Sequence, residues 1–307
     1  MLLTRSIFNL NHVRINCRHL SRHIKKSKVK SSDNQCLLKP RQLWRPVVVT
    51  ITVTGISFTS AIIIDYENFR LTSDLLPESF HQLRRKYDFI NKMYLTWNRL
   101  NSCEKIFVGV CAFNLLICLG LKTIPNRLCP YFVSQARTKN LFPSMILHIF
   151  SHSSLLHLAV NMYVLYSCLS MVNFHLGANQ SWALYLSAGV FASLASIVHK
   201  SIRRIHQPSI GASGAILGLL AASCMINPEA SLGIVFIPNL LIPAKYGICG
   251  IIALDTMGII RQWRLFDHAA HLGGTIFGIW YIKYGQELIW RQRTRLLRVY
   301  LDLKKRL

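Results

Sequence analysis

The amino-acid sequence predicts an all-α polytopic membrane protein, with a core of six transmembrane helices preceded by one additional N-terminal transmembrane helix. Charged residues make up only 16% of its 307 residues and apolar residues 51%, whereas an average soluble domain has about 25% charged residues. No Asp, Glu, Lys or Arg occurs from Asn140 to His199. Because one helix needs about 20 apolar residues to cross a bilayer, this stretch alone has room for two or three spans.

The first 45 residues differ in composition from the rest of the chain. They contain eleven of the 36 Lys and Arg residues but a single acid, Asp33, with Ser and Asn between the bases. This composition is typical of a mitochondrial presequence, and the apolar stretch near the start is too short for a secretory signal. We therefore interpret residues 1–45 as a targeting segment, the alternative being a basic tail that contacts lipid headgroups.

Seven apolar stretches follow, and each predicts a transmembrane helix. The first, residues 46–64, is weak because it contains four threonines. Balanced charges and several aromatic residues in the connector 65–104 predict a soluble segment with an amphipathic helix on the membrane surface. The predicted core, residues 105–284, contains the other six stretches, and a basic tail occupies residues 285–307. The six are residues 105–121, 154–172, 182–198, 210–226, 245–260 and 268–284.

The distribution of basic residues predicts which side of the membrane each loop occupies. The formal net charge is +24, but the bases lie at the predicted membrane edges, so we expect no nucleic-acid partner. The loops 122–139, 200–204 and 261–264 carry bases and share a side with the N-terminal segment, whereas 174–181 and 227–244 carry none. The positive-inside rule then places the N-terminus in the matrix, although the basic tail would lie on the opposite side.

Ser213 lies in an uncharged stretch that is rich in small residues. Gly211 and Ala215 are four residues apart, as are Gly214 and Gly218, and this spacing allows another helix to approach closely within a membrane. On its own, the pattern is more often a packing face with an incidental serine.

His271 lies on a second stretch of small residues and is a candidate partner for Ser213. His271, Gly274 and Gly278 have the spacing i, i+3 and i+7, which places them on one face of a helix. A neutral histidine can take the proton of a serine hydroxyl during attack and return it to the leaving amine. Taken alone, such a histidine is as often a structural residue at a helix interface.

Two motifs resemble the signatures of rhomboid intramembrane serine proteases. They are residues 211–215, Gly-Ala-Ser-Gly-Ala, and residues 270–278, which read Ala-His-x-x-Gly-x-x-x-Gly. The longer stretches 266–274, 278–281 and 284–290 are similar to the mitochondrial branch of this family, the presenilin-associated rhomboid-like proteases. The likeness covers roughly residues 105–290. It implies the rhomboid six-helix core and a catalytic dyad of Ser213 and His271 without a carboxylate.

The resemblance also implies supporting roles for several residues. His157 and Asn161 are four residues apart and match the family's His-x-x-x-Asn pair, so both, with the backbone N–H of Ser213, are expected to stabilise the oxyanion. By itself such a pair is more often a hydrogen-bonded contact between helices. His152 matches a position that supports loop packing, and the polar residues 151–154 are expected to line an aqueous cavity. The supporting glycines are Gly211, Gly214, Gly274 and Gly278.

We expect no metal site and no cofactor. The nine cysteines are scattered and never form a Cys-x-x-Cys pair, so we interpret them as small apolar residues. Several histidines occur, but the His-Glu-x-x-His motif of zinc proteases does not. Asp255, in the fifth core span, is expensive to bury without a partner, and we expect it to have a structural role as a hydrogen-bond donor between helices.

Together these observations predict an intramembrane serine endopeptidase of the mitochondrial inner membrane. The resemblance implies that its partners are the lipid bilayer and single-span transmembrane proteins, including fusion and quality-control factors. One departure from the wider family is that no Trp-Arg pair occurs between Pro125 and Lys139, which leaves the shape of that loop open. The alternatives are a catalytically inactive rhomboid-like protein that binds transmembrane helices and, more remotely, an ion channel or carrier.

Overall fold

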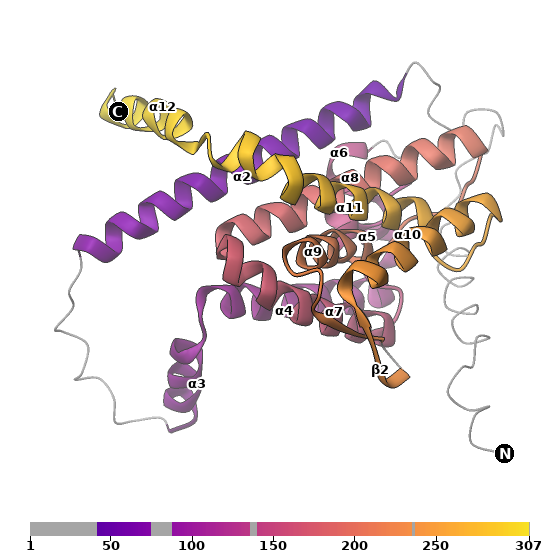
Figure 1. The fold of residues 1–307 in the computed structure, drawn as a ribbon, viewed down its shortest axis with the longest axis horizontal. Coiled ribbons are helices and arrows are strands. Elements are labelled where there is room, and N and C mark those ends of the chain that lie inside the picture. Colours follow the sequence, from indigo (N-terminus) through magenta and orange to yellow (C-terminus); the bar gives the residue numbers. More distant parts are fainter. Residues whose placement is uncertain (1–41, 75–87, 136–139, 235–236, 307) are drawn as a thin grey trace.

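The computed structural model of the chain describes residues 42–74, 88–135, 140–234 and 237–306. These residues form a helical bundle with one small β-hairpin (Figure 1), which confirms the predicted fold class. Most of the expected targeting segment, residues 1–41, lies outside the described residues, so its targeting role stays a prediction.

Every predicted span lies on a helix of the structure. The helices are α2 (Trp44–Asp74), α3 (Asp88–Arg99), α4 (Ser102–Thr123), α5 (Pro125–Phe132), α6 (Leu141–Leu147), α7 (Leu155–Leu176), α8 (Ala178–Arg203), α9 (Ser213–Ile226), α10 (Ala244–Ile260), α11 (His268–Trp280) and α12 (Arg293–Arg306). A 3-10 helix, η2 (His148–Phe150), precedes α7, and a π-helical segment, η3 (Tyr281–Trp290), continues α11.

Four helices of the described chain are long and apolar enough to cross a membrane. They are residues 44–71 of α2 and the whole of α4, α7 and α8. Helices α9 and α10 have 14 and 17 residues, fewer than the about 20 that a full span requires, and α11 has 13 before the π-helical segment η3 continues it. The chain is thus a multi-pass membrane protein, while the count of seven spans stays a prediction.

Helix α2 is longer than the sequence predicts, because it continues past residue 64 to Asp74. The C-terminal helix α12 stabilises this extension. Tyr300 and Lys304 of α12 both donate hydrogen bonds to the carboxylate of Glu67, over O–O and N–O distances of 2.9 and 2.7 Å. The additional turns of α2 are therefore fixed by a contact from the far end of the chain.

The loop between α9 and α10 contains a β-hairpin that the sequence patterns do not reveal. Its strands, β1 (Ser231–Ile234) and β2 (Ile237–Pro243), are antiparallel, with Ser231 opposite Pro243. The prolines of this segment disfavour a helix. Its strands are too short to show a clear periodic pattern of apolar residues in the sequence.

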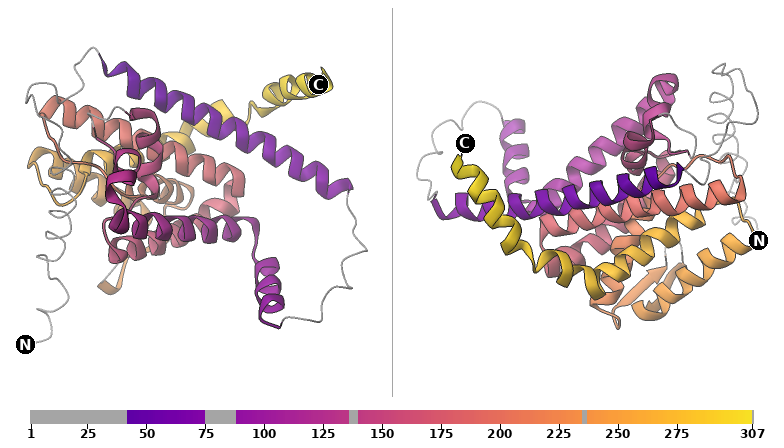
Figure 2. Two further views of the ribbon diagram at one scale, coloured as in Figure 1. Left: turned by 180° about the vertical axis from the view of Figure 1, so that it is seen from behind. Right: turned by 90° about the horizontal axis from the view of Figure 1, so that it is seen from above.

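Helix α9 lies at the centre of the bundle, in contact with α7, α8, α10 and α11 (Figure 1). Around it, α8 lies between α2 and α11 (Figure 2). Tyr281, at the start of η3, joins three of these elements. Its ring stacks on Phe58 of α2 at a centroid distance of 4.9 Å, and its hydroxyl accepts a hydrogen bond of 2.7 Å from the amide of Gln180 in α8.

Helices α9 and α11 touch through their glycines. A Cβ atom added to Gly274 would overlap the carbonyl oxygen of Gly214, and one added to Gly278 would overlap that of Gly218. The two backbones are therefore in direct contact, as the small-residue spacing predicts. This contact brings the N-terminal turns of the two helices side by side.

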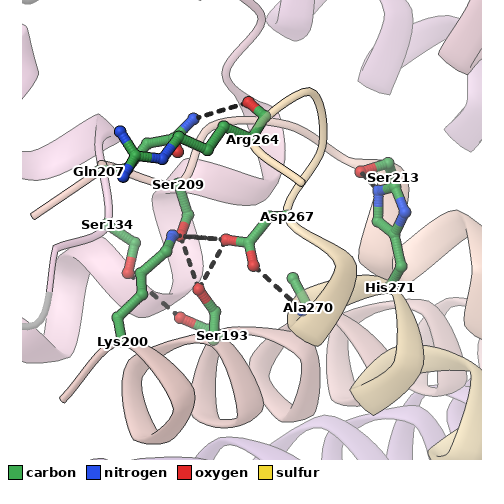
Figure 3. Close-up of polar contacts among 11 residues, drawn as sticks. Ser134, Ser193, Lys200, Gln207, Ser209, Ser213, Arg264, Asp267, Ala270 and His271 are labelled. Atoms are coloured by element: carbon green, nitrogen blue, oxygen red, sulfur yellow. Dashed lines mark hydrogen bonds and ion pairs between the residues drawn. The ribbon is translucent and has the colours of Figure 1, made fainter. Parts of the chain in front are cut away.

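A buried polar cluster joins the segments that precede α9 and α11 (Figure 3). We call Ser196, Lys200, Ser209 and Asp267 the Lys200–Asp267 cluster. The Oδ2 atom of Asp267 lies 2.6 Å from Nζ of Lys200, 2.6 Å from Oγ of Ser196 and 2.7 Å from Oγ of Ser209. The cluster thus ties the last turns of α8 to both segments.

The charges of this cluster determine the protonation of Asp267. Burial alone would raise the pKa of its carboxyl group, but the ammonium group of Lys200 and the hydroxyls of Ser196 and Ser209 hold that pKa well below its usual range. Lys200 is 5% exposed, so its ammonium group depends on this carboxylate for charge compensation.

Gly278→Ala is expected to lower the free energy of unfolding by about 1–3 kcal/mol, because the added methyl group has no space between α9 and α11. Gly250→Ala on α10 is the matched control, since a Cβ atom there meets no atom within 4 Å and alanine favours a helix. Thermal unfolding of the detergent-solubilised proteins measures the difference. Equal melting temperatures for both variants would contradict the close contact.

Asp267→Asn is expected to destabilise the protein by about 3–5 kcal/mol at neutral pH, because Lys200 then remains buried without a counter-charge. Since folding lowers the pKa of Asp267, its stabilisation is present above about pH 4, where unfolded Asp is ionised, and is lost at more acidic pH. The gap in melting temperature between variant and wild type should therefore narrow below about pH 4.

The control for this prediction is Glu229→Gln. Glu229 forms an ion pair with Lys245 over the same N–O distance of 2.6 Å as Lys200 and Asp267, but both side chains are exposed, so the expected loss is at most about 1 kcal/mol. A loss as small as this in Asp267→Asn, or a gap that does not change with pH, would refute the role of the buried pair.

Candidate active site

Ser213 is the first residue of α9 and follows a tightly held turn. Ser209 and Ser134 exchange two backbone hydrogen bonds, with N–O distances of 2.8 and 3.0 Å. Gly211 then adopts a φ of 132°, which a side chain would strain, and its N–H donates to the carbonyl of His148 at 3.2 Å. The turn directs the side chain of Ser213 toward α11 (Figure 3).

His271 lies on the first turn of α11 and faces Ser213 (Figure 3). The distance from Oγ of Ser213 to Nε2 of His271 is 2.8 Å, which is a hydrogen-bonding distance. Helix α11 begins after Asp267, whose carboxylate caps it by accepting a 3.2 Å hydrogen bond from the N–H of Ala270. Because Asp267 also binds Ser209, one carboxylate fixes the turn before Ser213 and the helix that carries His271.

Asp255 of α10 lies behind His271, on the side away from Ser213. Its Oδ1 atom is 3.3 Å from Nδ1 of His271 and 2.7 Å from Nδ1 of His268. The imidazole of His271 is therefore placed between a carboxylate and a hydroxyl. Asp255, His268 and His271 are also of residue types that can bind a metal ion, although the sequence predicts no metal site.

The link between Asp255 and His271 is absent from the sequence interpretation, which gave Asp255 a structural role only. One signal was available, because Asp255 is the single acid between Glu229 and Asp267, and a lone acid inside an apolar span is commonly functional. Its partner could not be identified, since nothing in the spacing relates α10 to the start of α11.

His157 of α7 lies next to the serine turn, and the turn leaves space for its ring. Nδ1 of His157 is 3.1 Å from Oγ of Ser153. A Cβ atom added to Gly211 would come within 3.0 Å of Cε1 and 3.3 Å of Nε2 of His157. Glycine at this position therefore permits the unusual φ and leaves room for the imidazole of His157.

Asn161 lies one helical turn after His157 on α7. Its side-chain amide donates to the backbone carbonyl of His157 at an N–O distance of 3.0 Å, and Asn161 does not line the cavity that Ser213, His157 and His271 share. The structure thus brings His157 to this cavity but leaves the amide of Asn161 bound to its own helix.

His152 packs behind His157, in a position that fits the expected support of the loop. The two rings are 5.2 Å apart at an angle of 66°, and burial lowers the pKa of His152 to about 3, so this histidine is neutral at physiological pH. The expectation that residues 151–154 line a cavity holds for Ser153 only. Ser151 instead donates to the carbonyl of Phe132 at 2.6 Å, and Ser154 accepts from the N–H of His157 at 3.1 Å.

A cavity of about 820 Å³ opens beside Ser213 and His271. Its walls come from the end of α8, the turn before α9, and the segment that joins α10 to α11. Three exposed apolar side chains of that last segment, Trp263, Leu265 and Phe266, line it as well. A cavity of this size can hold a short peptide segment together with water.

Comparisons with known proteins identify relatives of this chain. The model of the rhomboid domain family matches residues 140–286. The human mitochondrial presenilin-associated rhomboid-like protein is 40% identical over 275 residues, which are 86% of this chain and 72% of the human one. The zebrafish (Danio rerio) mitochondrial presenilin-associated rhomboid-like protein A is 38% identical over 293 residues, 87% of this chain and 76% of its own.

A more distant relative is the mitochondrial rhomboid protein 1 of the yeast Saccharomyces cerevisiae. It is 34% identical over 158 residues, which are 50% of this chain and 45% of the yeast protein. The family model covers the serine turn, the start of α11 and the cavity between them. The chain therefore belongs to the rhomboid family, in the branch of the mitochondrial presenilin-associated rhomboid-like proteins.

Proposed function

We propose that the protein is an intramembrane serine endopeptidase of the mitochondrial inner membrane, which hydrolyses peptide bonds in or beside transmembrane segments of other proteins. The observation that carries the proposal is the 2.8 Å distance between Oγ of Ser213 and Nε2 of His271, beside a cavity that can admit a peptide. Membership of a family that typically consists of such proteases supports it.

In the proposed reaction, Oγ of Ser213 attacks the carbonyl carbon of the scissile bond while Nε2 of His271 takes the hydroxyl proton. The imidazolium then gives this proton to the leaving amine, so the C–N bond breaks and an ester on Ser213 remains. Water from the cavity attacks the ester with His271 again as the base, which releases the acid and restores the serine.

The donors that we propose for the oxyanion are the backbone N–H of Ser213 and the imidazole of His157. The N–H of Ser213 is suited because the first N–H groups of a helix lack intrahelical partners. When Ser153 donates its hydroxyl proton to Nδ1 of His157, the Nε2 N–H is left for the substrate. Preorganised donors of this kind are worth about 3–4 kcal/mol each. Asn161 would contribute through the amide N–H that does not bind the His157 carbonyl.

Asp255 adds a third member to the proposed machinery, where the family resemblance implies a dyad. Its carboxylate can accept the Nδ1–H of His271, which leaves Nε2 as the acceptor that faces Ser213. A carboxylate in this position also stabilises the imidazolium that forms during attack. It would act as a positioning residue, because it contacts His271 and not the substrate.

The expected substrates are single-span membrane proteins, and a substrate helix must unwind locally to expose its carbonyl group. Helices weakened by Gly, Pro or polar residues are therefore the preferred class. The mitochondrial names of the relatives, the presequence-like residues 1–45 and the apolar helices support the inner-membrane assignment. In this proposal the chain consists of a connector (65–104), a protease core (105–284) and a basic tail (285–307) after its first transmembrane helix.

Labelling with a fluorophosphonate probe tests the proposed nucleophile and base. Wild type should be labelled, Ser213→Ala should not, and His271→Ala should react at least about 100-fold more slowly, because the hydroxyl has lost its base. Ser170→Ala is the control, since Ser170 lies on the exposed face of α7, where it bonds to the carbonyl of Tyr166, and this variant should be labelled as wild type is.

Labelling of Ser213→Ala at the wild-type rate would refute the assignment. A folded wild type that is never labelled would favour the alternative function, a catalytically inactive rhomboid-like protein that binds transmembrane helices. If labelling is as expected, reconstitution with a single-span test helix should show cleavage that is faster when a Gly-Pro pair interrupts the helix than when leucines fill it.

Asp255→Asn is expected to slow labelling by about tenfold or more. The reason is that an amide can donate to Nδ1 of His271, which forces the proton onto Nε2, where it blocks the base. The loss should stay below the about 10⁴-fold known for a triad aspartate that is hydrogen-bonded to its histidine, because Oδ1 of Asp255 is 3.3 Å from Nδ1 of His271. The labelling rate of Asp255→Asn should also depend on pH differently from that of wild type. Wild-type rates in Asp255→Asn would show that Ser213 and His271 act without the carboxylate.

A further inference from the structure

The side chains of Asp255, His268 and His271 form a compact group of metal-binding residue types at the cavity. One ligand atom of each lies within 4.8 Å of the others, and two of the separations are 2.7 and 3.3 Å. Asp255 and His268 are at most 4% exposed, and His271 is partly buried. We propose that these residues bind Zn²⁺, and that the bound ion inhibits the protease by occupying its general base.

The donor set is the reason for choosing zinc. Two imidazole nitrogens and one carboxylate oxygen are typical zinc ligands, whereas Ca²⁺ and Mg²⁺ prefer oxygen ligands alone. Three protein ligands with a fourth position open to water form the usual arrangement of a solvent-accessible zinc site. An inhibitory zinc ion departs from the expectation of no metal site. It does not require the His-Glu-x-x-His motif, which serves an ion that activates water for hydrolysis.

The three side chains must adjust to hold the ion. Zinc bonds of about 2.0–2.2 Å in a tetrahedron place neighbouring ligand atoms roughly 3.3–3.6 Å apart. The 3.3 Å separation of Asp255 and His271 already fits this, while Asp255 and His268, at 2.7 Å, must move apart. Nε2 of His268 has no hydrogen-bond partner among the described residues, so within that part of the chain only its Nδ1 contact with Asp255 restrains the ring by hydrogen bonding.

The ion can reach this site through the active-site cavity. His268 and His271 both line the cavity, as does Gly258 of α10. The ring of His268 packs so closely against Gly258 that a Cβ atom there would overlap it, so no side chain stands between the two helices at this point. Asp255 lies one layer deeper and supplies the negative charge that a divalent cation requires.

Inhibition follows from the tautomer that the ion imposes. Nδ1 is the nitrogen of His271 that faces Asp255, and when zinc binds there, the neutral imidazole carries its proton on Nε2. Nε2 then cannot accept the hydroxyl proton of Ser213, although it still lies beside it. Because the ion sits behind the imidazole and outside the peptide's path, kcat should fall while KM changes little. This part of the inference rests on the proposed function.

The binding step can be tested without any catalysis, in the Ser213→Ala protein. This variant keeps all three ligands and lacks the nucleophile. Titration with Co²⁺, the usual spectroscopic substitute for zinc, should give the visible absorption bands of a four-coordinate site, and added Zn²⁺ should abolish them. Absence of these bands, with folding verified by thermal unfolding, would refute the site.

His268→Asn, made in the same background, identifies the ligands. Asparagine keeps an amide donor for Asp255 but is a poor zinc ligand, so Co²⁺ affinity should fall at least about tenfold. The control is His206→Asn, because His206 is an exposed histidine that lines the same cavity but does not belong to the group of three. Equal losses in both variants would show that Co²⁺ binds elsewhere. His268→Gln provides a second substitution if His268→Asn does not fold.

The inhibitory step is measured in the protein that carries Ser213. Micromolar Zn²⁺ should slow substrate cleavage, EDTA should restore it, and the inhibitory concentration should rise at least about tenfold in His268→Asn. Equal zinc sensitivity of wild type and His268→Asn would overturn the mechanism. Metal binding by Ser213→Ala, combined with a wild type that is inert toward the fluorophosphonate probe, would support the site and refute the proposed protease activity.

Discussion

The direct contact between the backbones of α9 and α11 is the constraint on which the site depends. Ser213 and His271 each lie on the first turn of their helix, so the distance between their side chains follows from the distance between the helix axes. Glycines at the crossing make that distance as short as two helices allow. A serine hydroxyl and an imidazole, both short, can then meet at 2.8 Å without any shift of the backbone.

Two acids complete the arrangement, and each is compensated differently. Asp267 faces the ammonium group of Lys200, a partner that keeps it ionised and makes it a fixed point between the serine turn and α11. Asp255 faces two imidazoles, groups whose charge can change. The first acid therefore anchors the serine turn to α11, while the second lies against the histidine that faces Ser213. Both acids have partners, as the cost of burying a charged group in a membrane requires.

The sequence predicts much of this architecture, because hydropathy and small-residue spacing are local patterns. Each apolar stretch became a helix, and the stretches that contain Ser213 and His271 lie against each other. What the sequence could not supply depends on contacts between distant residues. The extension of α2 rests on Tyr300 and Lys304, and the neighbours of Asp255 belong to another helix. The hydrogen bond from the Asn161 amide to the backbone carbonyl of His157 could likewise not be derived from the spacing of these two residues alone.

The hydrogen bonds from Tyr300 and Lys304 to Glu67 also bear on how the molecule is assembled. Helix α2 precedes the core in the chain and α12 follows it, yet the two are held together on one flank of the bundle (Figure 1). During synthesis from the N-terminus, the charged end of α2 is made before α12, so the contact between them can form only after the whole core has been inserted. A chain whose core is incompletely inserted therefore lacks this contact.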